Sequence, residues 1–508
     1  MRTRALALRL ALAVLLAAAV PGPSSAQGPA PKGNVLYVGH HVDPTTLHPF
    51  GSTTVAFESV FGNVVEKLVL FEDGRAVIKP NLAKSWRWVN DTTLELKLLE
   101  NVRFSNGEPM DGTAVKYSLE ELGKAKPFQA WTKDVFKEIQ VVDPLTVRVV
   151  TPRPAPYLLP LLARGGFVLP PKHHQAVGFD KFALAPVGTG PFVFKEWVKD
   201  SSLTLERNPG FRGRPHPLER VVFKVIVEDT ARSAAIEAGE LDLALNVPVS
   251  HLKRLQGKPN LSVVQVEGLR KFAAYFDTSF PALKDPRVRV ALNLAVDKEA
   301  IVQSLVQGAA TAMPGQWQLA IEKGHNPEIK AYPYDPAKAK ELLAAAKYPT
   351  GTPLEIRYTV GRYPLDKELG EIVASYLEQV GVTVKQVPLE YGEFLRQRTA
   401  KQLGPIHQWG LLLTPDPWFN YSLFTAGTIY RFWDYPARWD ELILQASQEP
   451  SERRQTEMYN ELARISQADP FAIFLVVPRD LYATNRRVKG FSPRIDQALL
   501  LYGVTVAP

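Results

Sequence analysis

Residues 63–74 read NVVEKLVLFEDG, and residues 79–119 read KPNLAKSWRWVNDTTLELKLLENVRFSNGEPMDGTAVKYSL. The second segment contains the motif P-x-L-A-x-S-W at 80–86 and the turn-forming motif V-x-F-x-N-G-x-P at 102–109. A strand is predicted between the two motifs, and a helix is expected to begin near Thr113. The order of these pieces decides the fold.

Short motifs of this kind continue along nearly the whole chain. The motif E-x-L at Glu66–Leu68 precedes the motifs at 80–86 and 102–109. Later segments read PVGTGPF at 186–192, AIEAGELD at 235–242 and DPRVRVALNLAVD at 285–297. Together they resemble the extracytoplasmic solute-binding proteins of the peptide, dipeptide and nickel family (family 5), which feed ABC importers. Each motif alone is weak, but their order from residue 35 to residue 505 makes the resemblance specific.

The resemblance implies an α/β protein with two lobes joined by a two-strand hinge, and with a further domain inserted in the first lobe. The chain would cross between the lobes near Gly268 and Val477. Motif order places the first lobe at 34–54, 184–268 and 478–508, the inserted domain at 55–183 and the second lobe at 269–477.

Local patterns agree with alternating strands and helices. Asp285-Pro286 and Asp335-Pro336 each put a capping carboxylate before a proline at the first helical position, Asp297 can cap the helix between them, and Gly381 suits a left-handed helix end. Alternation or apolar runs predict ten strands, over 35–38, 94–98, 146–151, 203–207, 221–227, 261–266, 271–277, 354–360, 382–389 and 471–477.

The N-terminal segment 1–26 has the features of a cleavable signal peptide. Arg2 and Arg4 are followed by an apolar run over 5–20, a Pro-Gly-Pro break and small residues before Gln27. A retained anchor is the alternative, but the run is shorter than the roughly 20 apolar residues that a span needs. Because the chain has no Cys, we expect a periplasmic monomer without a lipid anchor, disulfides, thiolate metal sites or Cys nucleophiles.

The charge balance bears on possible partners. The chain has 60 Lys and Arg against 52 Asp and Glu, a net charge of +8. The basic residues are scattered among acids and never form a run longer than two. Nucleic acid is therefore not an expected partner. The resemblance instead implies a small-molecule solute and an ABC permease complex at the membrane.

The aromatic stretch WGLLLTPDPWFNYSLF at 409–424 is the strongest candidate for a site. As a loop it could line a pocket with flat apolar walls, and the resemblance implies that it lies against the ligand. Ordinary packing remains the alternative for each residue taken alone. The candidate contacts are Trp409, Leu413, Asp416 and Trp418 in this stretch, with Trp317, Tyr275, Asp277, His41 and Tyr430 elsewhere.

Position 413 departs from the family pattern. In peptide-binding relatives an Asp there pairs with the α-ammonium of the ligand, whereas this chain has Leu413. A desolvated ammonium without a partner would cost on the order of 3–5 kcal/mol. We therefore expect that ordinary peptides do not bind through a free amino terminus, unless Asp277 or Asp416 substitutes. The expected solute is oligopeptide-like, a modified peptide or a glycoside.

Catalytic and metal signals are thin. No G-x-S-x-G, H-E-x-x-H or phosphate-loop motif occurs, and the S-x-x-K match at 250–253 lacks its companion motifs. We therefore expect a protein that is not an enzyme and that needs no cofactor, with a secreted hydrolase as the alternative. A nickel-chelate binder is another alternative, but His40-His41, His173-His174 and His407 lack the spacing of a helical metal site, so no metal ligands are assigned.

Overall fold

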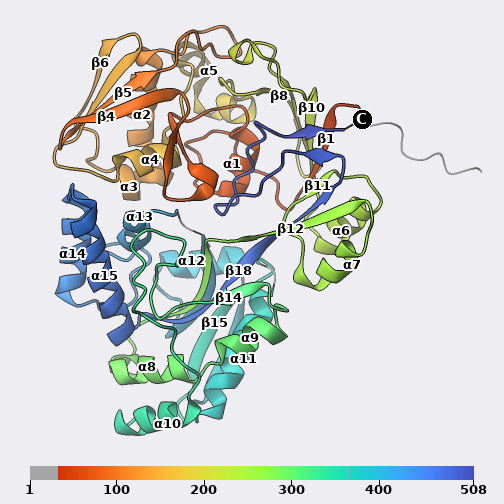
Figure 1. Ribbon diagram of the computed structural model, residues 1–508. Coiled ribbons are helices and arrows are strands. Elements are labelled where there is room, and N and C mark those ends of the chain that lie inside the picture. The colour runs from red at the N-terminus through yellow and green to blue at the C-terminus, as the bar shows by residue number, and fades with distance from the viewer. Residues whose placement is uncertain (1–32, 350, 364, 413, 508) are drawn as a thin grey trace, which may run out of the picture.

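One long strand connects the two lobes of this α/β protein (Figure 1). The structure, a computed structural model, describes residues 33–507 except 350, 364 and 413, so the predicted signal at 1–26 lies outside the described residues. Strand β18 (Ala472–Asn485) pairs through its first residues with β13 (Arg270–Phe276) and through its last residues with β12 (Leu261–Glu267). The link from β12 to β13 is the neighbouring connection between the lobes.

The first lobe is built on the part of the large sheet ordered β18-β11-β1-β10-β9-β8. Its central strand β1 (Val35–His40) is parallel to β10 and β11, and buried Leu36 and Val38 anchor it in the core. The other elements are β8 (Phe192–Val198), β9 (Ser202–Arg207), β10 (Arg220–Val225), β11 (Leu243–Ala244), β19 (Val488–Lys489), β20 (Thr505–Val506), α1 (Val55–Phe61), α6 (Asp229–Glu237) and α7 (Leu252–Gln256).

A separate antiparallel sheet, ordered β4-β5-β7-β6, extends this lobe. Helix α2 (Gly112–Lys124) packs against it and begins where predicted, because the Asp111 carboxylate accepts from the N–H groups of Thr113 and Ala114. The remaining elements here are β2 (Val69–Phe71), β3 (Ile78–Pro80), β4 (Ala83–Asn90), β5 (Thr93–Leu98), β6 (Glu138–Asp143), β7 (Thr146–Val150), α3 (Gln129–Thr132), α4 (Leu158–Gly165) and α5 (Pro171–Leu184).

The second lobe carries the sheet order β16-β15-β17-β13-β18, with β14 also paired to β18. The predicted caps are confirmed, since Asp285, Asp297 and Asp335 each accept a backbone N–H at a helix start, and Gly381 has a φ of 93°. The elements are β14 (Ala310–Ala312), β15 (Leu354–Val360), β16 (Val384–Glu390), β17 (Ile406–Leu412), α8 (Pro286–Leu294), α9 (Lys298–Ser304), α10 (Pro336–Ala345), α11 (Asp366–Gln379), α12 (Tyr391–Thr399), α13 (Pro417–Ser422), α14 (Ala437–Gln448) and α15 (Glu452–Ala468).

All ten predicted strands are present, but the reading of 409–424 as a loop was wrong. Trp409 lies inside β17, and Trp418 lies on helix α13. β17 is buried on both faces between β13 and β15. Its residues 406–411 are all buried, His407 and Gln408 included, so the sequence lacks the alternation of a half-exposed strand. The predicted domain boundaries stay a prediction. Among the described residues no helix is long and apolar enough to cross a membrane.

The second lobe contains a fully buried ion pair next to the connection between the lobes. Lys271 of β13 donates to Glu322 over 2.7 Å, and neither side chain is exposed. Glu322 also accepts from the N–H of Leu319 and from the side chain of Asn420 on α13. The pair therefore fixes α13 relative to β13, and losing one partner would leave a buried charge uncompensated.

We expect Lys271→Met to lower the free energy of unfolding of the second lobe by about 3–5 kcal/mol, because the Glu322 carboxylate keeps its burial and loses its cation. The double variant Lys271→Met/Glu322→Gln should recover most of that loss, since Gln keeps the accepting oxygen without the charge. Urea unfolding followed by tryptophan fluorescence measures both. Equal stability of Lys271→Met and the unmodified protein would contradict the expectation.

Candidate functional site

Two aromatic ring pairs join the lobes, and we call them the interlobe clasp. Trp418 stacks on Tyr157, with centroids 3.7 Å apart and planes 13° apart, and Phe419 meets Trp131 edge-on at 5.3 Å. Trp418 and Phe419 belong to α13 of the second lobe, whereas Trp131 and Tyr157 belong to α3 and the residue before α4 (Figure 1). Phe419 is fully buried in the core of the first lobe. The lobes are thus in contact at this end of their interface.

The clasp depends on how α13 is held. The Asp416 carboxylate caps the helix by accepting from the N–H of Trp418 over 3.0 Å. Burial raises the pKa of Asp416 to about 6. At the other side of the helix, Asn420 donates to Gln318 and to Glu322. Asp416 therefore acts on its own helix backbone.

A guanidinium of the second lobe lies over two stacked aromatic rings. The Arg398 guanidinium, at the end of α12, lies 4.5 Å from the Trp409 ring and 4.9 Å from the Tyr430 ring. Those rings stack on each other at 5.5 Å. Such contacts stabilise the cation by roughly 0.5–2 kcal/mol but give its N–H groups no acceptor.

Two further arginines converge on Tyr363. The guanidinium groups of Arg270 and Arg362 lie 4.9 Å and 5.0 Å from its ring. Burial raises the pKa of Tyr363, and the positive charges of Arg270, Arg362 and Arg398 oppose that rise, so all three cations act on one hydroxyl. The Asp366 carboxylate fixes the loop by accepting from the backbone N–H groups of 361–363. The cations therefore form one cluster, which we call the arginine cluster.

The arginine cluster has no anionic partner within the described residues. None of its three guanidinium groups makes an ion pair, and only Arg270 makes a side-chain hydrogen bond, to Gln497. Buried polar atoms without a hydrogen-bond partner among the described residues occur in both lobes, and five of them belong to the cluster and its neighbours, namely Arg362 Nε, Arg398 Nε, Trp409 Nε1, Tyr275 Oη and His41 Nδ1. Unpaired buried donors are costly, and in native proteins they call for an explanation such as a bound group.

The first lobe contributes His41, which follows β1. Burial lowers the pKa of His41 well below its usual range, and the charges of Arg362 and Arg270 lower it further, so the imidazole is neutral and faces the second lobe. His40 stacks on it at 5.2 Å. Asp43 is occupied elsewhere, because it accepts from Trp197 and from the N–H of Asp200.

The candidate contacts from the sequence fall into three groups. Trp409, Tyr430, Tyr275 and His41 lie together around the arginine cluster, whereas Trp418 lies in the clasp. Asp416 caps α13, Asp277 accepts from the N–H of Ser279 in a turn, and Trp317 is fully buried within the second lobe. Leu413 lies outside the described residues. As ligand contacts, all nine stay a prediction.

Sequence reasoning missed the arginines. Arg362 stands two residues after the predicted strand 354–360, and the carboxyl end of a strand in an α/β sheet is a common ligand position, so that signal was available. Arg270 stands two residues after the predicted crossing at Gly268. Arg398 carries no local signal, because only the tertiary fold brings it over Trp409.

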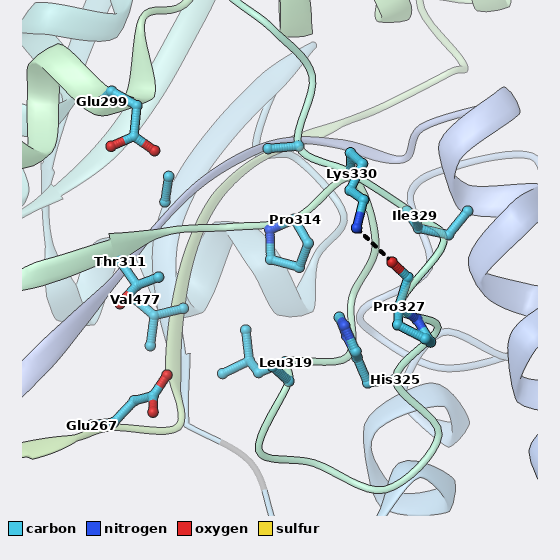
Figure 2. Close-up of a pocket in the computed structure, with 13 residues that line it drawn as sticks. Glu267, Glu299, Thr311, Pro314, Leu319, His325, Pro327, Ile329, Lys330 and Val477 are labelled. Carbon is cyan, nitrogen blue, oxygen red and sulfur yellow. Dashed lines mark hydrogen bonds between the residues drawn. The ribbon is translucent and has the colours of Figure 1, made fainter.

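A pocket of about 350 Å³ is lined by residues outside this cluster (Figure 2). It is formed by Glu267 and Val477 of the connecting strands and by second-lobe residues such as Thr311, Leu319 and His325. None of the unpaired atoms around the arginine cluster opens into it. His325 contacts the carbonyl of Gln318. We therefore place the candidate site at the lobe interface.

The described residues contain no metal site, since no group of three or more His, Cys, Asp or Glu side chains among them could hold an ion. His48 and His174 contact each other through their Nε2 atoms at 2.8 Å. His48 accepts from the N–H of Phe50, and His174 bonds to Tyr117, so both rings are used within the fold.

Comparison with known proteins gives consistent relatives. Residues 77–431 match the family described as bacterial extracellular solute-binding proteins, family 5 Middle. The chain is 28% identical over 512 residues to the probable D,D-dipeptide-binding periplasmic protein DdpA of Escherichia coli, covering 96% of each. It is 28% identical over 372 residues to heme-binding protein A of Haemophilus influenzae, covering 67% of each. DppA of Helicobacter pylori, solved with the peptide STSA, superposes with a TM-score of 0.82 at 24% identity, covering 94% of this chain and 98% of that one.

We expect Trp418→Ala to separate the lobes more often, because it removes the stack on Tyr157. An aromatic pair contributes about 1 kcal/mol, which corresponds to about a fivefold change in the ratio of joined to separated lobes. Small-angle X-ray scattering should show a larger radius of gyration. Trp88→Ala, on an exposed position of β4, is the matched control. Identical scattering from both variants would contradict the expectation.

Proposed function

The chain belongs to family 5 of the bacterial extracellular solute-binding proteins, and from this premise we propose that it captures an anionic organic solute between its lobes and delivers it to an ABC permease. The proposal rests on one observation, the arginine cluster without an anionic partner among the described residues. A carboxylated solute would supply acceptors for these donors at the interface.

The chemistry of the cluster favours carboxylate over a neutral ligand. A guanidinium offers a fork of N–H donors that matches a carboxylate in two parallel hydrogen bonds. A neutral glycoside could accept from these groups but would leave the charges of Arg362 and Arg398 uncompensated. Of the solutes expected from the sequence, a modified peptide with an additional carboxylate therefore fits best. The rings of Trp409 and Tyr430 would cover its apolar parts.

Closure around the solute gives the mechanism. The arginine cluster belongs to the second lobe and His41 to the first, so a solute that contacts both favours the joined arrangement by its differential affinity. Reversing a hundredfold preference requires about 5.5 kcal/mol of such difference. The connecting strands β12–β13 and β18 would act as the hinge, and a permease would recognise the closed form.

The relatives leave the ligand open. Their names specify a D,D-dipeptide, heme and the peptide STSA, so family membership alone does not select a solute. We place this protein in the periplasm as a monomer, exported by the signal predicted at 1–26 and without lipid attachment. Its relatives are solute-binding proteins, and we propose that it likewise has no catalytic activity.

The proposal is tested by isothermal titration with carboxylated solutes such as γ-glutamylglycine and glutarylglycine, each beside its dimethyl ester, which has no carboxylate, and with free di- to pentapeptides. The acids should bind and the esters should not. Arg362→Gln and Arg398→Gln should each weaken binding by roughly 10- to 100-fold, because each removes a charged hydrogen bond of about 1.5–3 kcal/mol.

Arg453→Gln, an exposed position on α15 whose side chain is 79% accessible, serves as the matched control and should change nothing. Mass spectrometry of the solute after long incubation should show it intact. Two results would contradict the anionic-solute proposal. One is that the esters bind as tightly as the acids, and the other is that Arg362→Gln, Arg398→Gln and Arg453→Gln all bind with equal affinity.

A further inference from the structure

An acid and a base flank one amide where the lobes connect. Gln497 Nε2 donates to Asp480 Oδ1 over 2.5 Å, and Gln497 Oε1 accepts from Arg270 Nη2 over 3.0 Å. Asp480 lies on β18 and Arg270 at the start of β13, whereas Gln497 comes from the C-terminal part of the first lobe. Asp480 and Arg270 make no ion pair with each other. The Gln497 amide stands between the acid and the base and bonds to both.

One oxygen of Asp480 is left without a partner. Asp480 Oδ2 is buried and makes no hydrogen bond among the described residues. Gly268 packs against this oxygen, because a Cβ at position 268 would lie only 2.8 Å from it, so any larger residue there would crowd Asp480. The charged and titratable groups that act on it are Arg270 from β13, Asp496 from the C-terminal segment and Tyr482 from its own strand.

We propose that Asp480 and Arg270 together bind an α-amino acid head group of the solute, with the ammonium on Asp480 Oδ2 and the α-carboxylate on Arg270. This inference rests on the proposed function and names the class of solute. An ammonium and a carboxylate on one carbon match an acid and a base that a single amide holds side by side. Gln497 is then a positioning residue.

The other two arginines of the cluster narrow the class of solute further. Arg362 and Arg398 remain for a second carboxylate further along the solute. In an ordinary dipeptide the ammonium and the carboxylate lie at opposite ends, so one head group cannot satisfy both Asp480 and Arg270. A side-chain-linked compound, such as a γ-glutamyl conjugate, carries an intact α-amino acid head and a distant carboxylate. The preferred class is therefore an amino acid conjugate linked through its side chain.

Proton linkage gives this assignment a distinct signature. Burial raises the pKa of Asp480 to about 7 in the free protein, with Asp496 adding to the rise and Arg270 opposing it. An ammonium on Asp480 favours the ionised carboxylate, so binding near pH 6 releases a proton and affinity rises between pH 6 and pH 8. A ligand that accepted from protonated Asp480 would show the opposite slope.

The experiment compares γ-glutamylglycine with glutarylglycine, which is the same molecule without its amino group, by titration at pH 6, 7 and 8 in two buffers of different ionisation enthalpy. We expect the amino compound to bind at least tenfold tighter, with proton release. In Asp480→Asn the advantage and the pH slope should both disappear. Glu267→Gln, an exposed carboxylate on the neighbouring strand, is the matched control and should keep both.

The outcomes separate this inference from the proposed function. If glutarylglycine binds as tightly as the amino compound, or if Asp480→Asn keeps the advantage, the head-group site is overturned and the anionic-solute proposal stands. If other carboxylated solutes bind and neither member of the pair does, the head-group site is again overturned. If no carboxylated solute binds, both fail. Thermal melting of Asp480→Asn confirms that the variant is folded.

Discussion

The continuous hydrogen-bond ladder of β18 is the constraint on which the rest of the structure depends. One strand pairs with β13 in the second lobe and with β12 in the first, so both lobes share a single backbone element. Asp480 lies on this strand and Arg270 on its partner β13, so the head-group site that we propose stands at the connection between the lobes.

The cost of the site is visible in its unpaired groups. Most buried polar atoms of a folded protein have partners, yet guanidinium nitrogens, an indole and a tyrosine hydroxyl around the arginine cluster have none among the described residues. By contrast, in the buried pair Lys271–Glu322 the ammonium donates to the carboxylate, which also accepts from the N–H of Leu319. The second lobe thus pairs this structural charge and leaves the guanidinium groups of the cluster without an ion pair, a difference that our proposed anionic solute would explain.

The sequence predicts the framework well because the framework obeys local rules. Helix caps at Asp285, Asp297 and Asp335 and the ten strands follow from neighbouring residues, and each is found. The stretch 409–424 was predicted as a loop for two reasons. Its strand is buried on both faces and shows no alternation, and the Pro and Asp residues between the strand and helix α13 suggest a loop. The arginine cluster joins residues 270, 362 and 398, whose proximity depends on tertiary packing that no local pattern encodes.

The Leu at position 413 supports our proposal that this chain keeps the family fold and takes a different ligand. With Leu413 in place of the acid found in peptide-binding relatives, an ammonium has no partner there, and the candidate substitutes Asp277 and Asp416 are engaged with backbone N–H groups. Asp480 is a carboxylate beside the arginine cluster with a free oxygen. In our proposal the partner of the ammonium is Asp480 on β18 in place of an acid at position 413. The ammonium and the α-carboxylate of the solute would then bind at the same end of the site.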